Sequence, residues 1–291
     1  MGSLLSPGMW RILASTLFLS LNGVFIKFAG QEAHVLQIVF VRSLAGLALC
    51  MVFAGGDVKS QVGVNRRLLA LRGFIGVFAM LFTFYAFTAL PVAEATVIFF
   101  VNPVFVSMLA WPFLRERMTG RKLACVAASF SGVLLVAQPG AMWGAASGLP
   151  LLGVAAALGG SFFSAGTMVV VRAIGTRERA LAPIFYLNAF TVAAVGGFAA
   201  ACWTWGSWGL WANLLAIGLL THLGQYCMTR GLSMESAGRG SAVGYFQIVF
   251  AIIWGMLFFS EYPDLLALAG AAVIMAGTLG LRERPKGAPN S

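Results

Sequence analysis

Several polar side chains interrupt apolar stretches of this sequence and are the residues that could do chemistry. Arg42 lies in VRSLAGLAL, Glu94 lies in PVAEATVIFF, and Asn102 directly precedes Pro103 in the same apolar run. A guanidinium, a carboxylate or an amide in such surroundings must contact water, an opposite charge, helix carbonyl groups or a bound solute. These residues could therefore bind a polar solute, exchange a proton or pair with one another.

Arg42 is the strongest candidate for a binding residue. It lies about nine residues into its apolar run, and at a rise of about 1.5 Å per residue this places it roughly 13 Å deep. Binding of a substrate or a gating role competes here with structural pairing. A shift of the sequence by 145 residues brings Asn188 close to the position of Arg42. Two polar residues at related depths favour a shared cavity wall.

Glu94 permits two interpretations. In the first helical turn after Pro91, a carboxylate interacts favourably with the helix dipole, which is a purely structural role. A buried carboxylate could instead take up and release a proton and so couple a proton gradient to solute movement. The shift of 145 residues places Arg239 at the related position. We expect Glu94 and Arg239 to act as coupling or gate residues, each in its own half.

The Asn102-Pro103 pair predicts a break in a helix. The proline removes one backbone hydrogen bond and frees the carbonyl of Phe99, which then needs water or a polar partner. Glu94, Ile98 and Asn102 recur every four residues, so we expect them to share a helix face beside a cavity. A packing kink is the alternative.

Further polar and aromatic residues extend the predicted cavity. THLGQYCMTRGL places polar groups at helical spacing, which favours a cavity lining, with hydrogen bonding between helices as the alternative. Lys27, near the end of its run, is expected to reach the membrane surface. The predicted cavity residues are Asn22, Arg42, Tyr85, Asn102, Thr167, Asn188, His222, Gln225, Tyr226, Tyr245 and Gln247.

The elements that position these residues are predicted to be membrane-spanning helices. Of the 291 residues, 60% are hydrophobic and 10% are charged, which excludes a water-soluble domain with an ordinary surface. No run alternates in polarity as barrel strands do, so the fold class is an all-α membrane protein. Ten runs approach the roughly 20 residues that span a bilayer. They are residues 9–29, 33–54, 68–90, 92–114, 120–138, 149–171, 181–202, 210–230, 238–259 and 263–281.

Charge predicts the orientation of these spans. With a cytoplasmic N-terminus, nearly all Lys and Arg residues, Arg72 among them, fall on the cytoplasmic side, and the opposite loops contain none. This positive-inside asymmetry places both termini in the cytoplasm. The net charge of +10 is thus a topology signal and predicts no nucleic-acid partner.

An internal repeat divides the chain into two halves. The shift of 145 residues aligns NPVF (102–105) with QIVF (247–250), and the nine identities that follow exceed the roughly three expected by chance. Each copy holds five spans, and because five is an odd number the second copy enters the membrane from the opposite side. The two copies are therefore inverted. Transporters that work by alternating access commonly have such inverted repeats around a binding site near the middle of the membrane. The predicted domains are a tail (1–8), a first repeat (9–138), a second repeat (149–282) and a second tail (283–291).

The sequence resembles the drug/metabolite transporter superfamily and its EamA-type repeat. The resemblance rests on ten spans, the repeat, the arginine in VRSLAGLAL, ALPVAEAT opening the fourth span, NPVF inside it and LRERMT closing it. It implies a central cavity between the halves, with the fifth and tenth spans peripheral. Similar members move amino acids, vitamins, nucleotide sugars or amines, commonly outward. The second repeat departs from the pattern at QIV, which lacks the proline.

These features predict a secondary transporter that exports a small polar or amphipathic metabolite, such as an amino acid-like carboxylate or amine. The alternatives are an uptake carrier for a vitamin or amine, a channel and a lipid scramblase. We expect no enzyme, no cofactor and no metal site, because catalytic motifs are missing and the four cysteines are scattered. The expected setting is the bacterial inner membrane, with lipid, a small-molecule substrate and protons as partners. Monomer and homodimer both remain open.

Overall fold

Every regular element in the described part of the chain is an α-helix. The computed structural model describes residues 6–53, 55, 62–114, 119–137, 149–174, 178, 181–235 and 243–281, and none of these lies in a strand. The N-terminal half contains α1 (Pro7–Glu32), α2 (Val35–Phe53), α3 (Arg66–Ala89), α4 (Val92–Phe99), α5 (Asn102–Leu114) and α6 (Gly120–Ala137). The C-terminal half contains α8 (Leu151–Ile174), α9 (Ala182–Ala201), α10 (Trp208–Met234), α12 (Phe246–Phe259) and α13 (Leu265–Gly280).

Several helices begin at side chains that cap them. Ser6, Asn65, Ser207 and Asp264 accept a hydrogen bond from a first-turn backbone N–H of α1, α3, α10 and α13, respectively. Such caps satisfy donors that have no partner inside the helix. At the other end of α12, Ser260 has a left-handed φ of 54° and reverses the chain before α13.

Seven helical stretches in the described residues have the length and composition to cross a membrane. They are α1, α2, α3, α4 together with α5, α6, α8 and α9. The apolar helices α12 and α13 are shorter, with 14 and 16 residues, and α10 is not among the seven. The all-helical prediction is thus confirmed for the described residues, whereas the number of ten spans stays a prediction.

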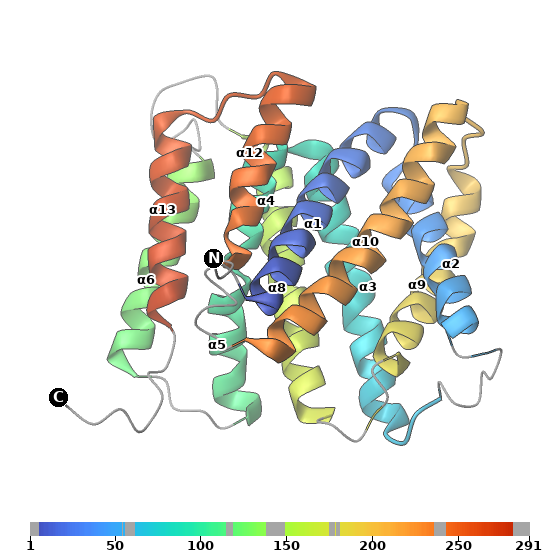
Figure 1. Ribbon diagram of the computed structural model, residues 1–291, viewed down its shortest axis with the longest axis horizontal. Helices are drawn as coiled ribbons and strands as arrows, with labels where there is room; N and C mark the ends of the chain where they lie inside the picture. The colour runs from blue at the N-terminus through green and yellow to red at the C-terminus, as the bar shows by residue number, and fades with distance from the viewer. Residues whose placement is uncertain are drawn as a thin grey trace.

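Helices of the two halves are interleaved (Figure 1). The most extensive contacts pair α1 with α10, α3 with α8, α6 with α13 and α2 with α9. Each pair joins one helix of the N-terminal half to one helix of the C-terminal half. In the repeat, α8 takes the place of α1 and α10 takes the place of α3. Exchanging the two halves therefore converts the pair α1 with α10 into the pair α8 with α3. This packing fits an architecture of two inverted repeats.

Helices α6 and α13 lie unusually close together at one side of the molecule (Figure 1). A Cβ atom at Gly132 would lie 2.7 Å from the carbonyl oxygen of Gly270, and one at Gly270 would lie 2.6 Å from the carbonyl oxygen of Gly132. Neither backbone can move away without separating the helices. Small residues therefore set the distance between the halves here.

The fourth predicted span is broken into α4 and α5 at Phe100 and Val101. As predicted, the carbonyl of Phe99 has a polar partner, because Ser161 Oγ on α8 donates to it at 3.2 Å. Asn102 Nδ2 in turn donates to the carbonyl of Ser161 at 2.9 Å. Two reciprocal hydrogen bonds thus hold the break against a helix of the other half.

A turn also interrupts the second half at the related place. Residues 243 and 244 are helical, Tyr245 lies in a turn, and α12 begins at Phe246. The shift of 145 residues converts Phe100 into Tyr245, and the two rings contact each other with centroids 5.3 Å apart. The break therefore occurs in both halves although the second copy lacks the proline. Equivalent residues meet where the two halves meet.

Candidate functional site

Arg42 is buried inside the helix bundle. It lies on α2 with 3% of its surface exposed, and its Nη1 is 2.8 Å from Met80 Sδ on α3 and 3.4 Å from Asn188 Oδ1 on α9. A thioether is a weak acceptor and 3.4 Å is long for a hydrogen bond, so neither contact compensates the guanidinium charge. Its Nε has no hydrogen-bond partner within the described ranges.

A second arginine lies near Arg42. Arg72 lies on α3, and a Cβ atom at Gly76 would be 3.1 Å from Arg72 Nη1 and 2.5 Å from Leu187, the neighbour of Asn188 on α9. Both arginines therefore reach the same turn of α9. Arg72 Nε and Nη1 are buried without hydrogen-bond partners in the described residues. The sequence-based prediction counted Arg72 only as a cytoplasmic charge. One signal could have identified it: Arg72 lies four residues inside the predicted span 68–90, or about 6 Å along the axis.

Polar side chains of α1 and α10 extend this region. Asn22 Oδ1, on α1, lies 3.4 Å from Thr221 Oγ1, whose proton is donated to the carbonyl of Ile217 at 2.7 Å. The next residue, His222, has Nδ1 at 2.8 Å from the carbonyl of Gly218, whereas its Nε2 is buried and has no partner in the described residues. The charge of Arg42 also acts on His222. The central polar cluster is defined here as Asn22, Arg42, Arg72, Asn188 and His222.

The central polar cluster supplies hydrogen-bond donors in excess of acceptors. Besides the arginine nitrogens, Asn188 Nδ2 is buried and lacks a partner in the described part of the chain. No carboxylate of the described residues lies within 4.0 Å of either guanidinium. Buried donors without acceptors are costly, so such a group is suited to binding a polar solute. The structure shows Arg42 packed among helices, and an open pocket beside it stays a prediction.

Other predicted cavity residues lie outside this cluster. Asn102 bonds to α8, the Tyr245 hydroxyl bonds to Thr278 on α13, and Thr167 Oγ1 donates to the carbonyl of Ser164 in its own helix. Tyr85 and Gln247 are partly buried.

The polar stripe predicted on α10 lies partly inside the helix bundle and partly on its exposed surface. His222 belongs to the central polar cluster, but Gln225 is exposed and Tyr226 has 62% of its surface exposed. The guanidinium of Arg230 instead lies over the ring of Tyr226, 5.9 Å from the ring centroid, in a cation–π contact. Arg239 lies outside the described residues.

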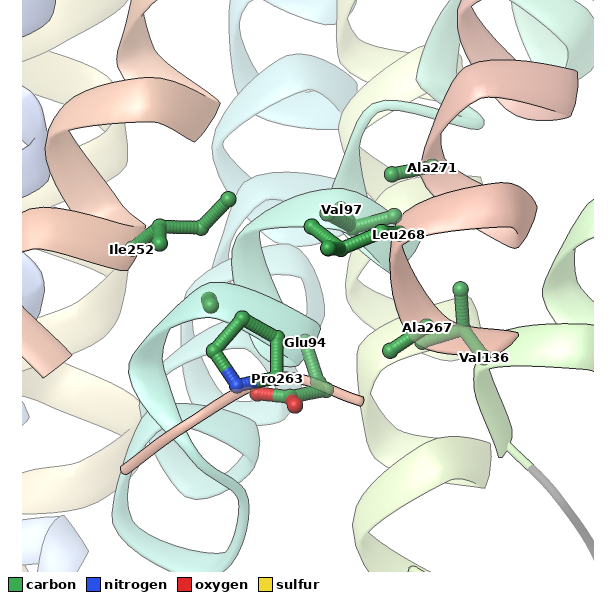
Figure 2. A pocket seen from close by; sticks show the side chains of 9 residues that line it. Glu94, Val97, Val136, Ile252, Pro263, Ala267, Leu268 and Ala271 are labelled. Atoms are coloured by element: carbon green, nitrogen blue, oxygen red, sulfur yellow. The ribbon is translucent and has the colours of Figure 1, made fainter. Parts of the chain in front are cut away.

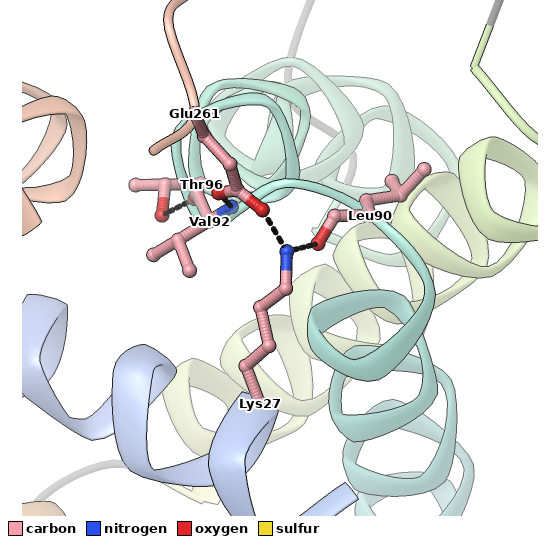
Figure 3. A network of polar contacts seen from close by, with 5 residues as sticks. All are labelled: Lys27, Leu90, Val92, Thr96 and Glu261. Atoms are coloured by element: carbon pink, nitrogen blue, oxygen red, sulfur yellow. Dashed lines mark hydrogen bonds and ion pairs between the residues drawn. The ribbon is translucent and has the colours of Figure 1, made fainter. Parts of the chain in front are cut away.

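A second ionic group lies at the end of the bundle where α1 ends and α4 begins. Lys27 Nζ on α1 pairs with Glu261 Oε1, from the segment between α12 and α13, and donates to the carbonyl of Leu90 at 3.1 Å (Figure 3). The other oxygen of Glu261 accepts from the N–H of Val92 at 3.0 Å. Lys27 was expected to reach the membrane surface, which stays a prediction; the structure adds that Lys27 pairs with a partly buried carboxylate of the other half.

Glu94 lies near this ion pair, in the first turn of α4, and lines a small pocket (Figure 2). The other walls come from α6, α12, α13 and the loop before α13, and are almost entirely apolar, including Val136, Ile252 and Leu268. Glu94 Oε2 is buried and has no hydrogen-bond partner in the described residues. The charges of Lys27, Glu261 and Asp264 all act on it. The end of the bundle where α1 ends is uppermost in Figure 1. We define the upper-end ionic group as Lys27, Glu94, Glu261 and Asp264.

The shared helix face predicted for Glu94 and Asn102 is wrong. The break at Phe100 and Val101 changes the helical register, so α4 presents Glu94 to α12 and α13 while α5 presents Asn102 to α8. Ile98, between them, is completely buried. The two polar residues therefore have different neighbours, and one cavity does not account for both.

Metal ligands are not grouped in the described residues. No cluster of three or more His, Cys, Asp or Glu residues there could hold a metal ion. The four cysteines are free thiols: Cys50, Cys125 and Cys227 lie on different helices, and Cys202 directly follows α9.

Comparison with known proteins gives consistent matches along the chain. The EamA-like transporter family matches residues 6–138 and 151–282. The pseudopaline exporter CntI of Pseudomonas aeruginosa (strain UCBPP-PA14) is 32% identical over 283 residues, which cover 95% of each chain. Human solute carrier family 35 member G1 is 28% identical, covering 94% of this chain and 78% of the relative. The S-adenosylmethionine uptake transporter of Rickettsia bellii is 26% identical, covering 94% and 92%.

A solved crystal structure shares the fold. It is similar with a TM-score of 0.59 at 17% sequence identity, covering 94% of this chain and 95% of the other.

The interleaved helical halves and the matches together define a multi-pass membrane protein of a transporter class. The chain belongs to the EamA-like transporter family, within the drug/metabolite transporter superfamily. The names of its relatives indicate transport of small molecules and not enzymatic activity.

Proposed function

We propose that this protein is a secondary transporter that exports a small polar or amphipathic metabolite by alternating access of its two halves. One observation carries the proposal: repeat-equivalent breaks at Phe100 and Tyr245 contact each other between interleaved halves. Broken helices at the interface of inverted repeats are the usual place for a transporter's binding site, because irregular backbone must line a cavity or contact protein.

The proposed cycle moves one half against the other. The upper-end pair of Lys27 and Glu261 joins α1 to the segment between α12 and α13, and so ties the halves together at one end. To open at that end, the protein must separate Lys27 from Glu261. At the same time the two halves come into contact at the other end of the bundle, which closes that end. The central polar cluster then faces each side in turn.

The finer topology belongs to the same proposal. We infer ten spans, with α4 and α5 forming one of them, two repeats at 9–138 and 149–282 between the tails 1–8 and 283–291, and both termini in the cytoplasm of a bacterial cell. The described basic residues near helix ends support this orientation, since Arg66, Arg67, Arg121 and Arg172 lie at ends on one side of the bundle (Figure 1).

Direction and coupling are proposed from the relatives and from the upper-end ionic group. Export follows the name of the relative from Pseudomonas aeruginosa, and an uptake carrier is the second candidate because the relative from Rickettsia bellii is named for uptake. Proton coupling is favoured by Glu94 itself, whose Oε2 is buried without a hydrogen-bond partner in the described residues, in a pocket next to the loop that holds Glu261.

Solute counterflow in proteoliposomes tests the proposal. Vesicles preloaded with unlabelled solute should take up the labelled solute transiently and with saturation, because a carrier exchanges bound solute without net flux. A panel of amino acids, organic acids and amines serves as solutes, and empty vesicles are the control. Unitary currents would show a channel, and movement of labelled lipid without solute exchange would show a scramblase.

A further inference from the structure

The central polar cluster has buried cationic donors, and the described residues place no anion within 4.0 Å of them. Arg42 Nε, Arg72 Nε and Arg72 Nη1 are each buried without a hydrogen-bond partner in the described part of the chain. Asn188 Nδ2 adds a neutral donor on the neighbouring helix α9. Both side chains reach the same turn of α9, and two like charges near one another make burial more costly.

Attraction to water or lipid head groups does not account for this arrangement. A long cationic side chain near a helix end normally extends its nitrogens into water. Arg72 lies near the start of α3, yet two of its three guanidinium nitrogens are buried. Arg42 is buried almost completely. The guanidinium group of Arg42 is thus directed into the bundle, and that of Arg72 is partly buried, with its Nε and Nη1 inside.

Construction of the fold does not require the charges either. The shift of 145 residues converts Arg72 into Ile217, which is completely buried, and brings the neutral Asn188 close to Arg42. The second half therefore packs with neutral residues at the related positions. Both cations come from the N-terminal half, where they give the centre of the bundle a net positive charge.

We propose that Arg42 and Arg72 form one binding site for a carboxylate-bearing organic anion, and that this is the substrate class of the transporter. The inference rests on the proposed function. A guanidinium presents two parallel N–H groups that match the two oxygens of a carboxylate. Two guanidinium groups beside the same turn of α9 favour a solute with two or more carboxylates. Asn188 and His222 supply further polar contacts to the same solute.

Binding to the purified protein tests the site. The probes are succinate, glutamate and citrate, with the neutral succinamide and the diamine putrescine at equal ionic strength as comparisons. Thermal stabilisation by at least one carboxylate, and by neither comparison, is expected. Arg72→Met should weaken that binding at least about tenfold, because one charge-assisted pair is lost. Arg67→Met, an exposed residue of the first turn of the same helix, is the matched control and should bind as the wild type does.

Arg72→Lys separates charge from geometry. It retains the cation but loses the planar fork, so affinity between those of the wild type and Arg72→Met is expected.

A measurement without ligand tests the same site. An unpaired buried cation destabilises the free protein, so Arg72→Met should raise its Tm by about 2–4 °C while removing anion binding. A lower Tm would show that Arg72 holds the fold together, and would overturn the proposal. This readout also detects a variant that fails to fold.

Phosphate and lipid are the competing anions. Inorganic phosphate joins the panel, and the melting experiment is repeated in nanodiscs of phosphatidylcholine with and without phosphatidylglycerol. Stabilisation by phosphate or by phosphatidylglycerol alone overturns the proposal. So does stabilisation by an amide or a diamine alone, carboxylate binding that survives in Arg72→Met, or no stabilisation by any carboxylate.

Failure of the site and failure of the proposed function are distinguishable. Counterflow of a neutral or cationic solute that survives in Arg72→Met would support the transporter function and overturn the anion site. Arginine-dependent carboxylate binding without any counterflow would support the anion site and overturn the transporter function.

Discussion

At the residue scale, two groups of ionisable side chains inside the bundle differ in their chemistry. The central polar cluster has cationic donors without acceptors in the described residues, whereas the upper-end ionic group joins Lys27 to Glu261 and leaves Glu94 Oε2 without a hydrogen-bond partner there. A protein that binds an anion in its centre and a proton near one end would have this distribution. The sequence could identify Arg42 and Glu94 from their position in apolar runs, but not the partners that give each its role.

Glu94→Gln tests the proton. Glu94 Oε2 is buried without a partner in the described residues and lines an almost entirely apolar pocket, so it is placed to take up and release a proton. The amide cannot do so, and we expect exchange to continue while transport no longer responds to a pH gradient across proteoliposomes. Glu32→Gln, an exposed carboxylate near the same end, should respond as the wild type does. An unchanged response of Glu94→Gln removes this residue from the mechanism.

Lys27→Met tests the contact between the halves. It leaves Glu261 partly buried without its cation and should lower the free energy of unfolding by about 1–3 kcal/mol. Thermal unfolding in detergent measures this change. The double variant Lys27→Met/Glu261→Gln should lose less than the sum of the two single losses, because the second substitution removes the unpaired charge. Strictly additive losses would show that the two residues do not interact.

At the element scale, the places where helices are interrupted determine which residues of the two halves contact each other. Ser161 holds the α4–α5 break by bonding to Phe99 and Asn102, and the related turn at Tyr245 has no proline. The first break could be predicted, because proline removes a known hydrogen bond. The second could not, because Tyr245 adopts a turn only in the context of its neighbours.

Pro103→Ala tests whether the break serves movement. Alanine restores the N–H that can bond to the Phe99 carbonyl, so α4 and α5 should join and exchange of backbone amides near residue 100 should slow. We expect slower counterflow with equal or higher thermal stability. Pro112→Ala, which changes a proline inside α5 and away from the break, is the matched control. Counterflow at the wild-type rate in Pro103→Ala would show that the break is not a hinge.

At the scale of the whole molecule, the two halves depend on each other for packing. Each of the main helix pairs joins one half to the other, and Gly132 against Gly270 brings α6 and α13 into backbone contact. A half by itself would expose these faces. The duplication therefore builds one interleaved body and not two separate bundles.

Labelling of cysteines tests the orientation of this body. Cys202 is exposed just after α9, at the end of the bundle opposite Arg66. With Cys50, Cys125 and Cys227 replaced by Ala, a membrane-impermeant maleimide should label Cys202 in intact cells. Arg66→Cys in a background without native cysteines should react only after the membrane is opened. The reverse pattern would place the termini outside.

The sequence by itself determined the membrane class, the helical fold, the repeat, the family and the position of the first break. These follow from composition, from periodicity and from the chemistry of single residues, which are local or additive properties. Only the tertiary structure decided that Lys27 pairs with Glu261, that Arg72 lies near Arg42, and that Glu94 and Asn102 face different helices. The reason is that such contacts depend on how each helix is rotated and where it is broken relative to helices far away in the chain.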